Sequence, residues 1–197
     1  FQNQNYLNTS PLNEMKVLIT GSEGQVGKKI TQQCLADKIP YVALPKSQLD
    51  ITSKTSIVQV LNLHDPSIII NAAAYTKVDL AEDNQETAYA VNALGPEILA
   101  QICNRQSIFL IHISTDYVFD GTKKTPYFEN DATNPINVYG SSKLKGEEAI
   151  ISRLDNYVIL RTSWVFSETG TNFVKTILKL LTKPQELKIV SDQFGSP

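Results

Sequence analysis

The segment 16–27 reads Lys16-Val17-Leu18-Ile19-Thr20-Gly21-Ser22-Glu23-Gly24-Gln25-Val26-Gly27. Its first five residues form a short apolar run, which predicts a buried strand that ends at the first glycine. The glycines at 21, 24 and 27 predict a tight turn into a helix over 25–36. A strand, a glycine turn and a helix in this order are typical of an α/β domain.

The rest of the chain repeats this alternation of apolar strands and amphipathic helices. We expect further strands at 41–44, 67–71, 108–113, 157–160 and 187–190, and further helices at 53–62, 86–105, 138–152 and 172–181. Strands that are apolar throughout favour a parallel sheet that is covered on both faces. The predicted fold class is therefore α/β, a doubly wound parallel sheet of the Rossmann kind with helices on both faces.

Composition limits the classes of function. The 197 residues are 42% hydrophobic and 19% charged, with a net charge of −2, which suits a soluble domain with a continuous core. Because the two signs of charge are interspersed, nucleic acid and anionic membranes are poor candidates as partners. The sequence shows no apolar run long enough to span a bilayer and no signal-peptide pattern, so we expect a cytoplasmic protein. Cys34 and Cys103 are expected to be buried, reduced thiols.

The chain divides into a short extension and one domain. Residues 1–14 are polar and rich in Asn and Gln, and we expect them to be disordered. Residues 15–197 form the predicted dinucleotide-binding domain. The chain stops in an expected loop, Gly195-Ser196-Pro197, which is an unusual place for a complete protein to end.

The glycine turn predicts a cofactor. Its backbone can approach a pyrophosphate, and the helix N-terminus that follows offers N–H groups and a positive dipole end. The second strand ends Leu44-Pro45-Lys46-Ser47, without the acidic residue that usually binds a ribose 2′-hydroxyl. Lys46 could meet a 2′-phosphate, or it could be an ordinary solvated lysine. The sequence thus predicts NADPH or NADH, with NADPH slightly favoured.

Three side chains suggest carbonyl chemistry. Tyr139 and Lys143 are four residues apart on one face of a predicted helix, and Thr115 follows the predicted fourth strand. A free tyrosine has a pKa of about 10 and needs a nearby cation to exchange protons at neutral pH. Lys143 supplies that cation, and the Thr115 hydroxyl can hold the oxygen that exchanges a proton with Tyr139.

Other candidate residues have simpler interpretations. His112 lies in an apolar strand and is expected to be a core histidine. Asp79, Glu82 and Asp83 are expected to form a solvated helix start, and no spacing of His, Cys and carboxylates predicts a metal site. For Trp164 two alternatives stay open, a core residue or a stacking partner for a sugar or base.

Several segments resemble one family. They are Gly21 to Gly27, Asn71-Ala72-Ala73-Ala74-Tyr75-Thr76-Lys77-Val78-Asp79, Ser114-Thr115-Asp116-Tyr117-Val118-Phe119, Asn137-Val138-Tyr139-Gly140-x-x-Lys143, Arg161-Thr162-Ser163-Trp164-Val165 and 192–197. From residue 15 onward the chain resembles the extended short-chain dehydrogenases/reductases and, among them, the dTDP-4-dehydrorhamnose reductases. The resemblance implies reduction of the 4-keto group of dTDP-4-dehydro-L-rhamnose, with Tyr139 as proton donor, Lys143 as its electrostatic support and Thr115 orienting the substrate.

The resemblance also implies binding residues. For the cofactor it adds Asp50, Ile51, Ala73 and Ala74 to the residues already indicated by the glycine turn, the end of the second strand and the predicted helix, which are Gly21, Gly24, Gln25, Val26, Gly27, Lys46, Tyr139 and Lys143. Those for the sugar nucleotide are Thr76, Val78, Thr115, Asp116 and Trp164. Relatives often carry an acid at the position of Pro45, and this departure puts NADH selectivity in doubt.

Two other functions stay open. A nucleotide-sugar epimerase or dehydratase would use the same tyrosine and lysine and recycle its cofactor, although Tyr117 follows Asp116 where dehydratases have a second acid. A regulatory subunit would bind NADP without turnover, which the presence of all three catalytic side chains argues against. Family members usually continue past the Gly-Ser-Pro segment into a smaller C-terminal region that completes the sugar pocket, so the resemblance implies that this substrate region is largely absent. If these residues are all there is, we expect cofactor binding with weak or absent reductase activity. The chain could also form a homodimer, in which a second copy supplies the part of the sugar pocket that this chain lacks.

Overall fold

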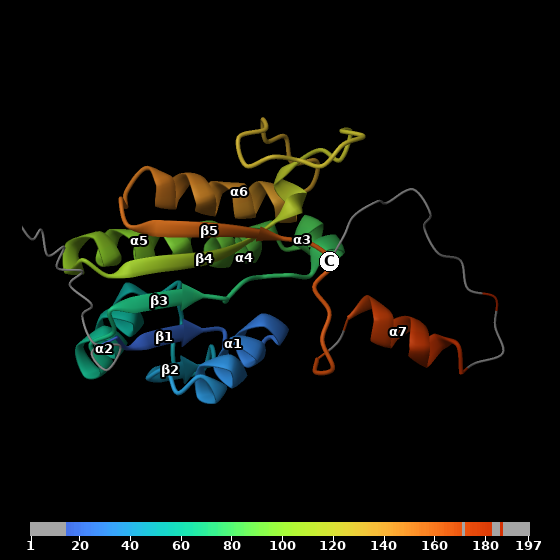
Figure 1. The fold of residues 1–197 in the computed structure, drawn as a ribbon. Helices are drawn as coiled ribbons and strands as arrows, with labels where there is room; N and C mark the ends of the chain where they lie inside the picture. Colours follow the sequence, from blue (N-terminus) through green and yellow to red (C-terminus); the bar gives the residue numbers. More distant parts are fainter. Residues whose placement is uncertain (1–14, 171, 183–185, 187–197) are drawn as a thin grey trace, which may run out of the picture.

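The computed structural model describes residues 15–170, 172–182 and 186. Within them, five parallel strands form one sheet in the order β2-β1-β3-β4-β5, which confirms the predicted α/β class (Figure 1). The strands are β1 (Val17–Thr20), β2 (Tyr41–Leu44), β3 (Ile68–Asn71), β4 (Phe109–Thr115) and β5 (Tyr157–Thr162). The strand predicted at 187–190 lies outside the described residues.

Helices connect the strands. They are α1 (Gln25–Ala36), α2 (Lys54–His64), α3 (Val78–Asp83), α4 (Gln85–Tyr89), the π-helical turn η2 (Ala90–Leu94), α5 (Gly95–Gln106), the 3-10 turn η3 (Asp116–Val118), α6 (Val138–Ile151) and α7 (Phe173–Leu180). Ser53 caps α2, accepting a hydrogen bond from the Ser56 N–H. Asp79 lies in the first turn of α3 as predicted, but the prediction of a helix start was wrong for Glu82 and Asp83, which are the last two residues of this six-residue helix.

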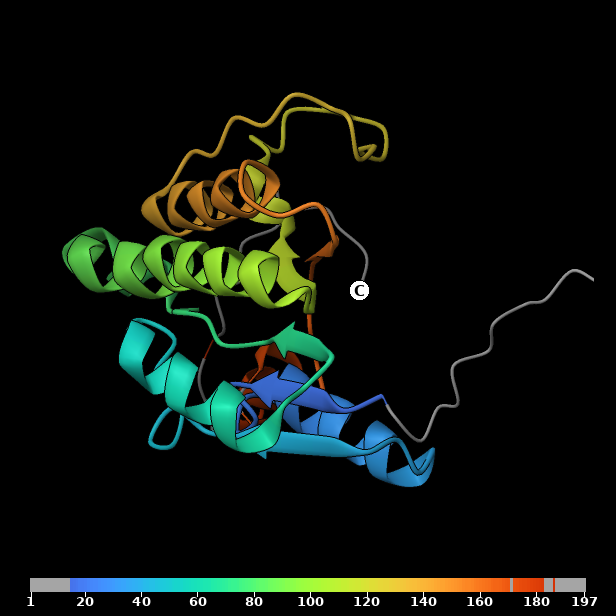
Figure 2. The same cartoon turned by 90° about the vertical axis from the view of Figure 1, so that its left-hand side faces the viewer.

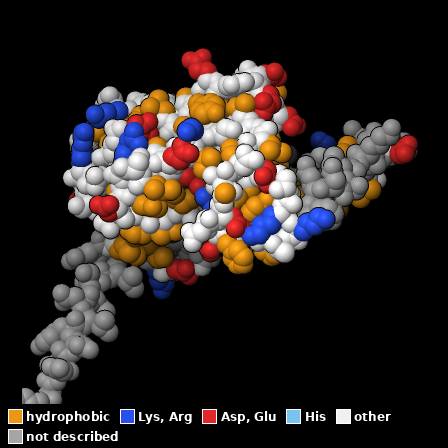
Figure 3. Space-filling view, turned by 90° about the horizontal axis from the view of Figure 1, so that it is seen from above, with side chains coloured by type: hydrophobic (Ala, Val, Ile, Leu, Met, Phe, Trp, Pro, Cys, Tyr) orange, Lys and Arg blue, Asp and Glu red, His pale blue; other side chains and the backbone are white. Residues whose placement is uncertain are grey.

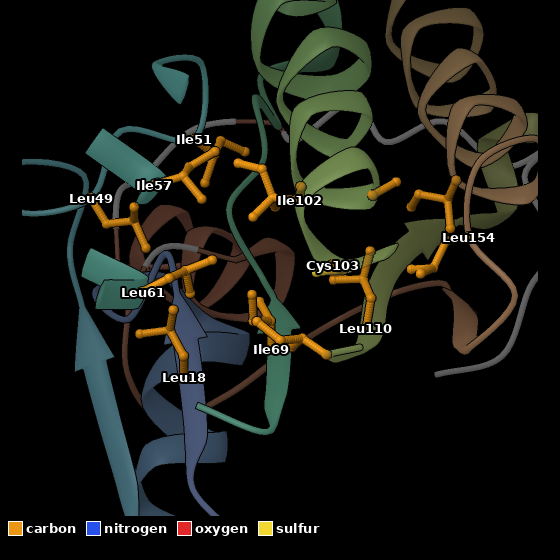
Figure 4. Close-up of a cluster of buried hydrophobic side chains, with 14 residues drawn as sticks. Leu18, Leu49, Ile51, Ile57, Leu61, Ile69, Ile102, Cys103, Leu110 and Leu154 are labelled. Atoms are coloured by element: carbon orange, nitrogen blue, oxygen red, sulfur yellow. The ribbon is translucent and has the colours of Figure 1, made fainter. Parts of the chain in front are cut away.

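Helices lie on both faces of the sheet, although Val158 and Leu160 of β5 are 39% and 45% exposed. Helices α2, α5 and α6 lie side by side on one face, and α1 packs on the other face against β1 and β2 (Figure 2). The larger core lies under α2, α5 and α6 and is formed by buried aliphatic side chains, among them Leu18, Ile69 and Leu110 from three neighbouring strands (Figure 4). Cys34 and Cys103 are both buried and free, as predicted.

The expected single helix over 86–105 is interrupted. A π-helical turn, η2, separates α4 from α5, and Pro96 lies in the first turn of α5. Proline has no N–H to donate to the carbonyl four residues earlier, which belongs to Asn92. That carbonyl faces α6 instead, and a Cβ added to Gly146 would lie 2.2 Å from its oxygen. A wider turn at this point is common near functional sites.

The parallel strands present their carboxyl ends at one edge of the sheet. In register, Thr20 of β1 lies beside Asn71 of β3, and Thr115 of β4 lies beside Thr162 of β5. On the molecular face in Figure 3, Lys and Arg side chains are interspersed with Asp and Glu. None of the helices within the described ranges has the length and apolar character that crossing a membrane would require.

Candidate active site

The three predicted catalytic side chains meet where β4 ends and α6 begins. Asn137 caps α6 by accepting a hydrogen bond from the Gly140 N–H at 2.7 Å, which places Tyr139 and Lys143 in its first two turns. Tyr139 is 9% exposed and Lys143 only 1% exposed. Thr115 is the last residue of β4, which confirms its predicted position at the carboxyl edge of the sheet, and it is also buried.

The environment of Tyr139 favours the protonated phenol. Burial raises its pKa, a hydrogen bond with Thr115 partly offsets this, and the negative charge of Asp116 raises the pKa further. The Thr115 hydroxyl donates to a carboxylate oxygen of Asp116 at 3.2 Å and accepts the Tyr117 N–H at 3.2 Å. Tyr139 is therefore arranged as a proton donor near neutral pH, rather than as a phenolate.

Lys143 is held from the sheet side. Its ammonium donates to the carbonyl oxygen of Ile113 at 2.6 Å, and its Nζ lies 3.2 Å from Nε2 of His112. Burial lowers the pKa of Lys143 to about 8, although the negative charge of Glu147 opposes the change. His112 is fully buried, which confirms the predicted core position.

An ion pair fastens α6 to the sheet. Glu147 is 1% exposed and accepts hydrogen bonds from Nε and Nη2 of Arg161 on β5, at 3.1 and 2.6 Å. It also accepts a hydrogen bond from the Ser114 hydroxyl on β4. Closer to the site, Gly140 allows backbone contact, since a Cβ there would lie 2.1 Å from the carbonyl oxygen of Tyr117. The helix that carries Tyr139 is thus fixed to β4, β5 and η3.

The glycine turn forms a cradle beside these residues. Gly21 has a φ of +63°, and an added Cβ would lie 2.7 Å from Ala73; one on Gly27 would lie 2.3 Å from the Gly21 oxygen. The turn therefore requires glycine at both positions. Helix α1 starts at Gln25 after Gly24, which makes no side-chain cap, so the first N–H groups of the helix are available to an anion. This cradle fits the pyrophosphate of a dinucleotide.

A cleft of about 330 Å³ joins the cradle to the catalytic side chains. Of the predicted site residues, those that line it are Gly24, Gln25, Val26, Ala74, Thr76, Val78, Thr115, Asp116, Tyr139, Lys143 and Trp164. Trp164 is 41% exposed, which rules out the core alternative, and its ring contacts Phe173 edge to face at 5.9 Å. Gln25 Oε1 also accepts a hydrogen bond from Asn172 at 3.0 Å.

The other predicted residues lie outside this cleft. Gly21, Gly27 and Ala73 are the packing surfaces of the turn itself. Ile51 is 3% exposed within the larger core, and the Asp50 carboxylate accepts hydrogen bonds from Thr52, which lower its pKa. Lys46 is exposed at the end of β2. The adenine-side roles of these three residues stay predictions.

The sequence reasoning missed part of the cleft wall. The residues that also line it are Ala72, Ile113, Ser114, Tyr117, Thr162, Ser163 and Val165. All of them lie close after the carboxyl end of β3 or β5, or at that of β4, so the edge rule for parallel sheets was the available signal. Among the residues described by the structure, no group of three or more His, Cys, Asp or Glu could hold a metal ion.

The fold and the site define a Rossmann-type α/β protein with the Thr, Tyr and Lys arrangement of short-chain dehydrogenases/reductases. The family described as "RmlD substrate binding domain" matches residues 15–197, and the chain belongs to this family. A dTDP-4-dehydrorhamnose reductase of Aggregatibacter actinomycetemcomitans is 45% identical over 184 residues, 92% of this chain and 62% of that protein. One from Burkholderia thailandensis is 42% identical over 93% of this chain and 61% of its own length.

A solved structure gives the same relationship. The dTDP-4-dehydrorhamnose reductase from Bacillus anthracis, in complex with NADP, superposes with a TM-score of 0.89 at 40% identity. The match covers 93% of this chain and 65% of that one. The chain therefore spans under two thirds of the length of these relatives.

Proposed function

We propose that this chain catalyses the NADPH- or NADH-dependent reduction of the 4-keto group of dTDP-4-dehydro-L-rhamnose to dTDP-L-rhamnose. The observation that carries the proposal is one cleft in which Thr115, Tyr139 and Lys143 lie beside a glycine cradle. The substrate class is supported by relatives of 45% and 42% identity that bear the name of this reductase.

The chain's own residues would bind the cofactor in the cradle. The backbone N–H groups at the start of α1 would hold the pyrophosphate, and Ala74 would lie along the cofactor. Lys46 would meet a 2′-phosphate, and the Bacillus anthracis relative in complex with NADP supports this preference. When bound, the dihydronicotinamide supplies the hydride that reduces the ketone.

Tyr139 supplies the proton that completes the reduction. The Thr115 hydroxyl orients the ketone oxygen, and the buried phenol, whose pKa is raised, keeps its proton until negative charge develops on that oxygen. The phenolate left behind is stabilised by the Lys143 ammonium one helical turn away. One hydride and one proton thereby convert the ketone to an alcohol.

The sugar nucleotide would lie between two loops of the cleft. Thr76 and Val78 follow β3, and Asp116 and Trp164 follow β4 and β5. The half-exposed Trp164 ring offers an apolar surface for stacking against a sugar or base. These four residues are proposed to select the substrate.

The test mixes the chain with NADPH and dTDP-4-dehydrorhamnose and follows the loss of dihydronicotinamide absorbance. Tyr139→Phe should lower kcat by about 10²- to 10⁴-fold, because the proton donor is removed. Tyr89→Phe, an exposed tyrosine on α4, is the matched control and should keep the wild-type rate. Equal loss of absorbance in wild type and Tyr139→Phe would remove Tyr139 from the mechanism.

The same experiment separates the reductase from an epimerase. A reductase oxidises one NADPH for each keto-sugar reduced and releases the product cofactor. A cofactor that stays bound through purification, with the sugar converted and no net oxidation, would support the epimerase class instead.

A further inference from the structure

A row of polar side chains crosses the sheet directly above the aliphatic core. Thr20 on β1, Asn71 on β3 and His112 on β4 are neighbours in register, and His112 reaches Lys143 on α6. On β4, the residue two positions before His112 is Leu110, which lies in the core. Thr20, Asn71 and His112 are 0% exposed and Lys143 is 1% exposed. Burial of polar groups is tolerated only when they bind one another.

The row is continuous. Thr20 Oγ1 lies 2.6 Å from the Asn71 side-chain oxygen, and the Asn71 amide nitrogen lies 3.0 Å from Nδ1 of His112. Nε2 of His112 lies 3.2 Å from Nζ of Lys143, which also donates to the Ile113 carbonyl. If one side chain in the row gains or loses a proton, its neighbours must therefore exchange their donor and acceptor roles to keep every hydrogen bond.

Counting donors shows how the members are linked. An ammonium has only donors, so next to charged Lys143 the Nε2 of His112 must accept, and its proton must be on Nδ1. The Nδ1–H then needs an acceptor. The Asn71 side-chain oxygen supplies it once the amide group is flipped by 180°, so that oxygen and nitrogen exchange places. In that orientation the amide nitrogen donates to Thr20 Oγ1, which also accepts the Ala73 N–H at 3.3 Å.

With a neutral Lys143 amine the arrangement reverses. Nε2–H of His112 donates to the amine, and Nδ1 accepts from the Asn71 amide, whose oxygen then accepts from Thr20. The two arrangements use the same heavy-atom positions, since an amide and its half-turned form have the same shape. The tautomer of His112 and the charge of Lys143 therefore change together.

We propose that His112 is a positioning residue that holds the Lys143 ammonium by accepting a hydrogen bond from it at Nε2, with Asn71 and Thr20 fixing the Nδ1–H tautomer. The inference deepens the proposed function and rests on it only for the role of Lys143 beside Tyr139. It assigns a function to a buried polar row that would otherwise only cost folding free energy.

The charges around the row agree with this assignment. Burial, followed by the charge of Lys143, lowers the pKa of His112 well below its ordinary value, so the imidazole stays neutral. The titratable groups that interact with Lys143 are His112 from β4 and, from its own helix, Glu147, which is paired with Arg161 from β5. The charge of Glu147 raises the pKa of Lys143, but burial outweighs it and the pKa is about 8. Below that pH the ammonium predominates, which requires the Nδ1–H tautomer.

Histidine NMR tests the proposal directly, since the chain has two histidines, His112 and His64. In protein labelled with ¹⁵N-histidine, long-range ¹H–¹⁵N correlations distinguish the two neutral tautomers from each other and from the imidazolium. At pH 7, His112 should be the Nδ1–H tautomer, and it should convert to Nε2–H as the pH rises through about 8. His64, at the end of α2, gives an internal reference. An Nε2–H tautomer or an imidazolium at pH 7 would overturn the proposal.

Two lysine variants sharpen the test. Lys143→Met removes the titrating amine, so the tautomer of His112 should no longer change with pH. Lys145→Met, an exposed lysine on the same helix, should keep the wild-type conversion. A conversion that persists in Lys143→Met contradicts the proposal. If Lys143→Met does not fold, the tautomer of His112 in the wild-type chain at pH 7 and above still tests the proposal.

The NMR result is independent of turnover. A chain that oxidises no NADPH but shows the tautomer conversion would refute the proposed function and support this inference. An active enzyme in which the tautomer of His112 does not change with pH would support the proposed function and refute this inference.

Discussion

The side chain of Asn92 binds both backbone groups of Tyr75. Its oxygen accepts the Tyr75 N–H at 2.8 Å, and its amide nitrogen donates to the Tyr75 carbonyl at 3.0 Å and to the Ser142 hydroxyl at 3.0 Å. Ser142 in turn donates to the Tyr139 carbonyl at 2.8 Å. One buried amide thus connects the segment that carries Ala74 and Thr76 to the helix that carries Tyr139.

We therefore expect Asn92→Ala to destabilise the fold by about 2 kcal/mol, because it leaves backbone groups of Tyr75 without partners. Urea denaturation measures the change in the free energy of unfolding. Asn84→Ala is the matched control, since Asn84 is exposed and its side chain donates one hydrogen bond, to the Leu80 carbonyl; its effect should be within about 0.5 kcal/mol. Equal effects for the two variants would contradict the prediction.

The two ion pairs of α6 should differ in strength. Arg161→Met leaves the buried carboxylate of Glu147 without its counter-charge and should cost about 3 kcal/mol of stability. Lys145→Met breaks a pair in which both side chains are half-exposed, 61% and 50%, and should cost less than about 0.5 kcal/mol. Denaturant melts of both variants make the comparison, and a small loss for Arg161→Met would show that Glu147 finds another partner.

Stability should depend on pH through Lys143. Its pKa is about 8 in the folded chain and has a reference value of 10.5, so between these values only the unfolded chain keeps the proton. The free energy of unfolding contributed by Lys143 therefore rises with pH across this window, by about 3 kcal/mol at most. The free energy of unfolding of Lys143→Met, measured over the same pH range, is subtracted from that of the wild type. The difference removes the contribution of the tyrosines, which titrate in both proteins. A difference that is flat between pH 8 and 10.5 would mean that Lys143 has its ordinary pKa.

The Thr115 hydroxyl should matter more than its methyl group. Thr115→Val removes the hydroxyl that orients the ketone and should lower kcat/KM by about 10²-fold in the reductase assay. Thr115→Ser keeps the hydroxyl and should stay within a few-fold of wild type. If both variants lose activity equally, packing of the methyl group is responsible and the hydroxyl has no special role.

Cofactor choice should depend on Lys46. If Lys46 binds a 2′-phosphate, Lys46→Ala raises the KM for NADPH by about tenfold and leaves the KM for NADH unchanged. Steady-state kinetics with both cofactors measure the ratio. Lys38→Ala, an exposed lysine in the turn after α1, is a suitable control. A wild-type preference for NADH would contradict the role given to Lys46.

Sequence reasoning found the parts of the site that depend on local pattern. The glycines at 21, 24 and 27 and the four-residue spacing of Tyr139 and Lys143 are short-range signals, each contained within a few residues of the chain. Parallel sheets bring strand ends to one edge, so Thr115 could be placed near Tyr139 without coordinates.

What the sequence could not show depends on long-range contacts. Asn92 appeared as one polar residue in a helical stretch, because its partners Tyr75 and Ser142 are 17 and 50 residues away. The π-helical turn that carries it was hidden for the same reason. His112 was placed in the core correctly, but its partners on β3 and α6 emerged only from the register of the strands.

Gly140 and Gly146 let α6 rest directly on the carbonyls of Tyr117 and Asn92. Backbone atoms cannot move to another rotamer as side chains can. The distances from α6 to η3 and to η2 are therefore fixed by the radii of the contacting atoms. Aliphatic side chains in the core below can therefore be exchanged for others of similar volume while Tyr139 keeps its place. The position of Tyr139 in this chain therefore depends more on these two glycines than on the identity of the core side chains.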